Sequence, residues 1–600
     1  MRKFISFIKG FHFYKRKELL EAAASFTKKQ SVIFLSLVVL SIILVVILLA
    51  KINSTFMVSV PVSGGTITEG IIGVPTLVNP VGAITDADKD LTALVYSGLM
   101  RKDEYGEIIP DLASSYEISP DGKNYTFILK DDARFHDGEK VTADDVVFTI
   151  EKIKDPIVKS PRRMSWDGVS VYKTDDKTVV FTLAQPYISF LDNTTIGILP
   201  VHLWKDVNVN EFNINPLNTS KAIGSGPYKI VSVSKNNDGI PEEYKLKRFT
   251  RFALGKPLIK RINIVSFSNE KDLIKALTNG SIDQAGGVSS ENSEMLEKEG
   301  FAIHTATLPR IFGIFFNSEK NKIFSDENVV RAIDMGIDRQ EIVNKILGGY
   351  GSVIHNPVPG DVVYDENIEN YERSRVDEAV NLLDKAGWKL GEDGIRTKGG
   401  TTSKVVTKKV NGKTVKQTVN SQEPLTRLSF SIITGDTPEL RQTAELIKEQ
   451  LAKIGVEVNI DRVYETGQLN QLIRAREYEA LFFGQVVNHE SDLYSFWHSS
   501  QKRDPGLNIA MYNNPKVDSA LELIQKILKP EDRMGKYENL KKEFDAKIPA
   551  ILIYSPEYIY ATSPSLNNIY LETITISSDR LSSVYKWAAD RDNVWKIFTK

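Results

Sequence analysis

Residues 90–156 read DLTALVYSGLMRKDEYGEIIPDLASSYEISPDGKNYTFILKDDARFHDGEKVTADDVVFTIEKIKDP. The apolar spacing from Leu91 to Val95 predicts a helix. Alternation of apolar and polar residues from Tyr125 to Leu129, after a Pro-Asp-Gly turn, predicts one strand of a hairpin. The pattern Thr142-x-x-Asp145 is a capping-box signal for a second helix, which Pro156 ends. This order predicts a mixed α/β structure.

Five short motifs occur in this segment in a fixed order: Val95–Leu99 (VYSGL), Pro110–Ala113 (PDLA), Ser119–Gly122 (SPDG), Phe135–Gly138 (FHDG) and Thr142–Val146 (TADDV). Their wording and order resemble the extracellular solute-binding proteins of the peptide and nickel class, the recognition subunits of ATP-driven importers. The resemblance continues in Leu199–Trp204 (LPVHLW) and Gly224–Lys229 (GSGPYK) and covers nearly all of residues 66–570. We interpret Gly224–Lys229 as a turn and a strand, because the chain holds no G-x-x-x-x-G-K-[ST] phosphate loop.

The resemblance implies an α/β, two-lobe periplasmic-binding-protein-like fold of the large peptide-binding type, with an extra subdomain. The residues agree with such a fold, since a strand at 428–433, a helix face from Leu440 to Ile454 and a strand at 456–460 form a βαβ pattern. We expect the first lobe to comprise residues 66–306 plus 554–600 and the second lobe residues 307–553. Two chain crossings between them would form a hinge.

Composition limits the alternatives. The chain has 600 residues, a formal net charge of −1 and no cysteine. This length is too great for a single hydrophobic core. A net charge near zero gives no reason to expect nucleic acid as a partner. The absence of cysteine excludes disulfides, thiolate metal sites and cysteine nucleophiles. The chain also lacks the lipid-attachment cysteine that many members of the family it resembles carry.

A membrane anchor is predicted instead near the N-terminus. Residues 31–50 contain no charge and are long enough to cross about 30 Å of hydrocarbon. Residues 1–30 contain eight Lys or Arg and two Glu, an excess of 8 − 2 = +6, so this basic segment is expected to stay cytoplasmic and the rest to be exported. A cleaved signal peptide is the alternative to an uncleaved signal anchor.

Two further segments stand outside the lobes. Residues 51–65 are expected to be a linker ending in a Pro-Val-Ser-Gly-Gly run. Residues 396–420 carry seven basic residues and no acidic one, and Asn411-Gly412 between two Val/Thr/Lys-rich runs predicts a hairpin with a type I′ turn. We interpret this hairpin as a solvated insertion, with contact to acidic lipid heads as the alternative.

The resemblance places the ligand site at residues 479–497, where peptide binders of the family carry a tryptophan, an aspartate that pairs with the ligand's ammonium group, and an Asp-Pro. Here His489 stands at the aspartate's place, Asp492 at the acidic position of the Asp-Pro, and Leu493 replaces its proline. Glu490 or Asp492 would therefore balance an ammonium group, or the ligand has no free N-terminus. The predicted ligand-binding residues are Gly484, Gln485, Val486, Val487, Asn488, His489, Glu490, Asp492 and Trp497.

Other interpretations of these residues stay open. Glu490 and Asp492 are also typical N-cap residues for a helix at 493–498. His489 and His498 suggest a nickel site, but a third ligand and metal-site spacing are lacking, so no metal and no cofactor is predicted.

The sequence predicts a binding protein and not an enzyme, since no G-x-S-x-G elbow or zinc-site spacing occurs. The resemblance implies a monomeric, membrane-anchored extracellular or periplasmic subunit of an ABC importer. It would close on oligopeptides or dipeptides and deliver them to a permease driven by ATPase subunits. The alternatives are a surface sensor or adhesion protein, and a binder of another solute such as a nickel chelate.

Overall fold

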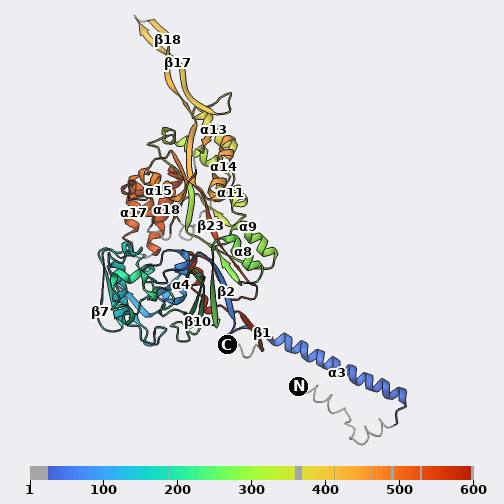
Figure 1. Ribbon diagram of the computed structural model, residues 1–600. Helices are drawn as coiled ribbons and strands as arrows, with labels where there is room; N and C mark the ends of the chain where they lie inside the picture. The colour runs from blue at the N-terminus through green and yellow to red at the C-terminus, as the bar shows by residue number, and fades with distance from the viewer. Residues whose placement is uncertain are drawn as a thin grey trace, which may run out of the picture. The chain divides into compact units, whose positions relative to one another are not determined.

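The computed structural model describes residues 25–187, 189–358, 368–410, 413–460, 463–487, 492–527 and 530–595. The chain forms two compact units (Figure 1). One contains the residues up to Val62 together with those from Asp590 onward, and the other extends from Ser63 to Ala589.

The first unit is built on α3 (Lys28–Phe56), whose stretch Lys28–Asn53 is long and apolar enough to cross a membrane. Thr27 caps its start together with Gln30. We expected a linker over residues 51–65. Residues 51–56 instead continue α3, and β1 (Met57–Val62) pairs antiparallel with β24 (Asp590–Trp595). Pairing satisfies backbone groups that an isolated extended segment leaves to water. The residues from Asp590, expected in the first lobe, thus belong to this unit.

Among the described residues of the second unit, one mixed sheet of 13 strands forms the framework. β2 is parallel to β11 and β12, β19 is parallel to β20 and β22, and β14 is antiparallel to both β22 and β23. The βαβ pattern of residues 428–460 predicted a mixed or a parallel sheet, and the structure has the mixed form. Along its main path the strands are β20 (Glu457–Asn459), β19 (Ser429–Gly435), β22 (Ala480–Val486), β14 (Arg310–Phe316), β23 (Ala550–Thr562), β12 (Gln284–Gly286), β2 (Thr66–Ile72), β11 (Arg261–Phe267), β10 (Pro241–Arg248) and β9 (Tyr228–Lys235).

The long strand β23 joins the two halves of this sheet (Figure 1). Its first residues pair with β14, and its last residues pair with β12 and β13 (Ala302–Thr307). The short strand β15 (Gly351–Val353) pairs with its middle. The second connection between the halves is the passage from β13 to β14 through Leu308 and Pro309.

The buried apolar residues form separate cores in the two halves. In one half, the first cluster draws on residues 67–308 and 558–587, and a smaller cluster joins residues 273–296 to Ile559 and Ala561. In the other half, two clusters draw on residues 314–554. Besides α4 (Asp86–Val95) and α5 (Ala143–Lys154), the helices that contribute to these cores include α8 (Glu270–Thr278), α9 (Ser290–Lys298), α10 (Glu327–Gly336), α11 (Arg339–Ile346), α13 (Val376–Lys385), α14 (Pro438–Ala452), α15 (Thr466–Ala475), α16 (Asp492–Trp497), α17 (Pro515–Ile524) and α18 (Pro530–Lys547).

The segment at 90–156 folds as predicted. α4 (Asp86–Val95) precedes the hairpin of β5 (Ala113–Ile118) and β6 (Asn124–Leu129), which continues through β8 (Thr178–Leu183) to β7 (Val169–Lys173). α5 (Ala143–Lys154) follows, and the backbone N–H of Thr142 donates to Asp145 Oδ2 at 2.8 Å. The capping box and Pro156 therefore set the limits of this helix.

The predicted hairpin insertion is also present. β17 (Arg396–Val410) and β18 (Lys413–Arg427) pair antiparallel, with Val410 opposite Lys413. Its central residues 411 and 412 lie outside the described part of the chain. The ladder reaches Arg427, beyond the expected limit at residue 420.

Candidate functional site

A hollow of about 440 Å³ lies in the half of the second unit that contains α4. Segments distant in sequence line it, among them α4, β3 (Met100–Lys102), the residues around Arg162, the loop at 192–197, and the η6 turn (Ser577–Leu581) with its flanks. The lining mixes apolar side chains such as Ala93 and Ile196 with hydroxyl, amide and charged groups. The size of this hollow is within the range of small-ligand sites.

Close backbone packing shapes the wall beside α4. A Cβ at Gly98 would meet the carbonyl oxygen of Thr195 at 2.5 Å, and one at Gly226 would meet the carbonyl carbon of Val95 at 2.6 Å. The Gly-Ser-Gly-Pro-Tyr motif therefore serves as a packing turn in the structure, and Tyr228 begins β9.

His136 of the Phe-His-Asp-Gly motif ties the same wall together. Its Nδ1 accepts from the backbone N–H of Gly224 at 3.4 Å, and its Nε2 lies 3.0 Å from the carbonyl oxygen of Gly226. Burial lowers the pKa of His136 to about 4. The ring is therefore neutral at pH 7. Because Nδ1 accepts a hydrogen bond and Nε2 faces a carbonyl oxygen, the proton lies on Nε2. The motif thus links the loop at His136 to the turn at Gly224–Gly226.

A buried ion cluster holds the C-terminal wall. The Arg580 guanidinium donates to both oxygens of Asp90 at 2.8 Å and through Nε to Glu69 Oε1 at 2.9 Å. The hydroxyl of Tyr560 donates to Glu69 Oε2 at 2.8 Å. Burial raises the pKa of Asp90, because the charged form has lost its water. Arg580 thereby fixes η6 against α4 and β2.

The residues predicted as a ligand site are placed elsewhere, on and after β22. Gly484 lies against the Phe312 ring, where a Cβ would come within 2.6 Å. Gln485 is buried and donates to the carbonyl oxygen of Leu507 at 3.3 Å. Val486 is 45% exposed, whereas Val487 is buried and donates its backbone N–H to Pro309 at 2.7 Å. These four residues thus lie beside the crossing between the halves, and none of them lines the 440 Å³ hollow.

The remaining predicted residues divide into two groups. Asn488, His489 and Glu490 lie outside the described residues, and Asp492 is the first residue of α16. Trp497 is 2% exposed and packs against Phe315 and Phe544. Its ring borders an internal space of about 10 Å³, the size of a single water molecule.

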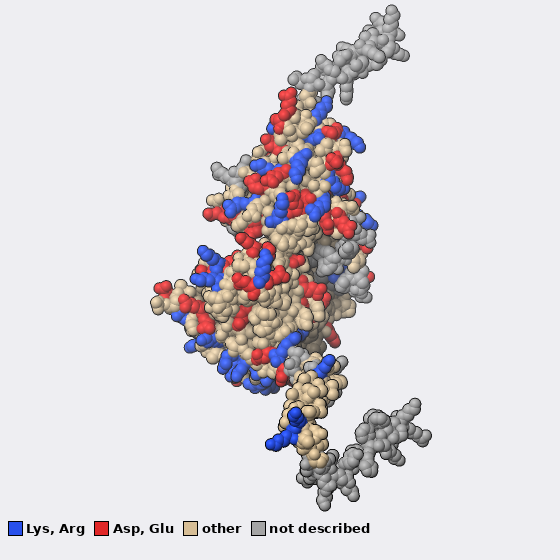
Figure 2. All heavy atoms as spheres, turned by 90° about the vertical axis from the view of Figure 1, so that its right-hand side faces the viewer, with Lys and Arg blue, Asp and Glu red and all other residues tan. Residues whose placement is uncertain are grey.

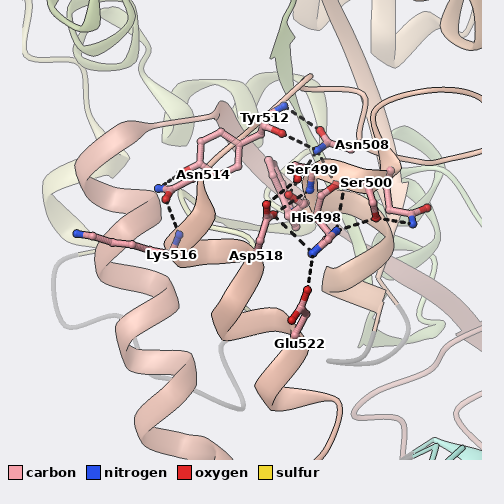
Figure 3. A network of polar contacts seen from close by, with 11 residues as sticks. His498, Ser499, Ser500, Asn508, Tyr512, Asn514, Lys516, Asp518 and Glu522 are labelled. Atoms are coloured by element: carbon pink, nitrogen blue, oxygen red, sulfur yellow. Dashed lines mark hydrogen bonds and ion pairs between the residues drawn. The ribbon is translucent and has the colours of Figure 1, made fainter.

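His498, which suggested a metal, belongs to a capping network (Figure 3). Its Nδ1 accepts from the backbone N–H of Ser500 at 3.2 Å and lies 2.7 Å from that hydroxyl, while Nε2 faces Glu522 Oε1 at 3.5 Å. Asp518 accepts from the backbone and hydroxyl of Ser499. Because Nδ1 already accepts, its lone pair is occupied. Within the described ranges, no three potential metal-ligating side chains gather.

Comparison with known proteins decides the family. The family model for bacterial extracellular solute-binding proteins, family 5 (Middle), matches residues 107–505. The chain belongs to this family. It is 27% identical over 505 residues to the oligopeptide-binding protein AppA of Bacillus subtilis, covering 83% of this chain and 87% of AppA.

Solved structures show the same fold. The structure of B. subtilis AppA in complex with a nonapeptide matches with a TM-score of 0.62 at 26% identity, covering 88% of this chain and 99% of AppA. NikZ from Campylobacter jejuni in complex with Ni(L-His) matches with a TM-score of 0.64 at 26% identity, covering 87% of this chain and 99% of NikZ. The predicted periplasmic-binding-protein-like fold is confirmed.

Sequence reasoning missed the hollow of this family 5 protein. Its cations include Arg101, which donates to Asp111 at 2.9 Å, and Lys102, which donates to Thr575 at 2.5 Å. Arg162 also lines it. An arginine in a Pro-Arg-Arg triplet reads as a solvated surface residue, and no local signal distinguishes it from its neighbour Arg163.

Proposed function

We propose that this protein is the membrane-anchored, extracellular substrate-binding subunit of an ABC importer that captures peptides between two lobes and delivers them to a permease. The observation that carries the proposal is the similarity to the oligopeptide-binding protein AppA over 83% of the chain. We take the lobes as residues 66–306 plus 554–589 and residues 307–553.

The connections between the halves support closure about a hinge. The chain passes from one half to the other at Leu308–Pro309 and along β23, and the Ser555 hydroxyl donates to the carbonyl oxygen of Leu308 at 2.8 Å. Two adjacent crossings permit rotation with small changes in backbone dihedral angles. A peptide that contacts both lobes favours the closed state, because only that state offers both sets of contacts.

The first unit supports anchoring. α3 can cross a bilayer by its length and composition, and its basic N-terminal flank favours the cytoplasmic side. The folded unit from Ser63 onward would then lie outside the cell or in the periplasm as a monomer. On the face shown in Figure 2, acidic and basic side chains are interspersed over this unit. This surface gives no reason to propose nucleic acid as a partner.

A second candidate is a binder of a metal chelate. It is favoured by the similarity to NikZ, whose structure holds Ni(L-His). A third candidate is a surface sensor that kept the binding fold. Genes for a receptor kinase beside this gene, in place of permease and ATPase genes, would favour it.

Native mass spectrometry of the full chain in lipid nanodiscs tests the proposal. We expect a mixture of short peptides to co-purify and to dissociate on activation. A single nickel chelate or a sugar would contradict the peptide assignment. Small-angle scattering is the second readout, and the folded unit should become more compact when peptide is added.

A further inference from the structure

We propose that Arg162 receives a carboxylate of the captured ligand, so that the protein selects peptides that place a C-terminal or side-chain carboxylate in the 440 Å³ hollow. This inference rests on the proposed function. It adds the chemical group that is recognised and the residue in the first lobe that recognises it.

The backbone around Arg162 is held from both sides. Its N–H donates to Ser160 Oγ at 3.3 Å, and its carbonyl accepts from the backbone N–H of Ser165 at 3.1 Å. Ser160 Oγ in turn donates to the carbonyl oxygen of Val81 at 2.5 Å, and Trp166 is buried in the core. The side chain of Arg162 is nevertheless exposed in the hollow. The backbone at Arg162 is therefore held in place, while its long cationic side chain extends into the hollow.

The other arginine of the hollow is already satisfied. Arg101 donates to Asp111 at 2.9 Å and to the carbonyl oxygen of Ser582 at 2.6 Å, and its guanidinium lies 5.1 Å from the centre of the Phe252 ring. By contrast, the Arg162 guanidinium has no hydrogen bond or ion pair with any residue that the structure describes. A guanidinium carries five N–H donors, so its full capacity is available to a ligand.

The acid that acts on Arg162 through space is Asp579. Its Oδ2 accepts the backbone N–H groups of Thr575 at 2.8 Å and Ile576 at 3.1 Å. These bonds hold the carboxylate on its own turn, where it caps η6. Asp579 therefore increases the tendency of Arg162 to stay charged without forming an ion pair with it.

Arg162 lines a recess, where neighbouring protein atoms limit the water around its side chain. Burial lowers the pKa of Arg162, although its side chain is exposed to solvent. That combination is expected for a group inside a recess, where protein atoms displace part of its hydration. The guanidinium remains charged at neutral pH, and a carboxylate can accept two parallel hydrogen bonds from it.

The rest of the lining fits a peptide that carries such a group. Ala83, Ala93 and Ile196 offer apolar surface, and Ser165 and Asn193 add polar groups near Arg162 in the same hollow. The hollow also contains Asp111, Asp192 and Asp579, whose carboxylates contact Arg101, Lys102 (at 3.7 Å) and two backbone N–H groups, respectively. An apolar body with an anionic end directed at Arg162 fits the groups that remain. A C-terminal carboxylate and an acidic side chain offer the same chemistry, and binding experiments separate them.

The test uses full-length protein in nanodiscs and isothermal titration with one peptide in three forms: free acid, C-terminal amide, and free acid with every Glu replaced by Gln. We expect Arg162→Gln to weaken the form that carries the recognised carboxylate by about 10- to 100-fold, the range for a charge-assisted hydrogen bond. The affinity of Arg162→Lys should lie between those of wild type and Arg162→Gln, since lysine keeps the positive charge but cannot donate two parallel hydrogen bonds. Arg163→Gln removes the same charge one residue away and should bind like wild type.

The outcomes separate the two proposals. If wild type binds all three forms equally, or Arg162→Gln binds as tightly as wild type, this inference is overturned while peptide capture stands. If wild type binds no peptide, the proposed function fails and this inference falls with it. The comparison of the three peptide forms on wild type needs no variant. It therefore tests whether a carboxylate is recognised even if Arg162→Gln does not fold.

Discussion

Arg580 and Asp90, separated by 490 residues in sequence, face each other through two parallel hydrogen bonds of 2.8 Å, Nη1 to Oδ1 and Nη2 to Oδ2. Both side chains are buried, and Glu69 shares the same guanidinium. This pair holds the last part of the second unit, which contributes η6 to the hollow, against α4.

We expect Arg580→Met to destabilise the protein by about 3–5 kcal/mol, because two buried carboxylates lose their counter-charge. Urea unfolding of wild type and variant, followed by tryptophan fluorescence, measures the change in the free energy of unfolding. The matched control is Lys298→Met, which breaks an exposed pair with Glu294 on α9 and should leave the unfolding midpoint unchanged. Equal midpoints for Arg580→Met and wild type would contradict the role of the cluster.

Two glycine substitutions should act in opposite directions. A Cβ at Gly98 would lie 2.5 Å from the Thr195 carbonyl oxygen and 2.8 Å from that of Ile196, so Gly98→Ala should cost about 1–3 kcal/mol and distort the hollow. Gly535 lies in α18 with no atom within 4 Å of an added Cβ, so Gly535→Ala should gain about 0.5–1 kcal/mol. Thermal unfolding compares both with wild type, and a destabilised Gly535→Ala would refute the expectation.

His136 should make stability depend on pH. Burial lowers its pKa from the ordinary 6.5 to about 4, so between these values the unfolded chain binds a proton that the folded chain does not. The contribution of His136 is complete above pH 6.5 and is lost as the pH falls toward 4, by about 3 kcal/mol in total.

The measurement for His136 is the unfolding free energy at several pH values from 4 to 7.5. His136→Gln keeps a donor and an acceptor on the side chain but cannot titrate, so its stability should fall less steeply on acidification than that of wild type. His304, whose pKa is also lowered by burial, contributes a slope of the same sign to both proteins. Identical slopes for the two proteins would rule out the assignment to His136.

Asp492 begins α16 and stays a predicted partner for the ligand's ammonium group. We expect Asp492→Asn to weaken binding of peptides with free amino ends by roughly 10-fold, through loss of a charge-assisted contact. Acetylated peptides should bind the variant and wild type alike, which titration calorimetry can establish. Equal affinity of wild type for free and acetylated peptides would argue against this role.

Local signals predicted much of the fold. The capping box at Thr142 and Asp145 and the stop at Pro156 act within one or two turns of helix, so α5 could be delimited from sequence. The Asn-Gly at residues 411–412 predicted that the runs on either side of it pair, and β17 and β18 do pair antiparallel. The apolar run within α3 was evident because a membrane-spanning length needs no tertiary partner to be recognised.

Distant contacts decided the rest. The pairing of β1 with β24, the position of Trp497 inside the core, and the hollow around Arg162 each bring together residues whose partners are far away in the sequence. The amino-acid sequence by itself determined the family, the α/β class and the apolar N-terminal helix, because these follow from short-range pattern and motif order. Only the tertiary structure decided which charges are already paired and which remain available to a ligand, because pairing depends on separations in space and not along the chain.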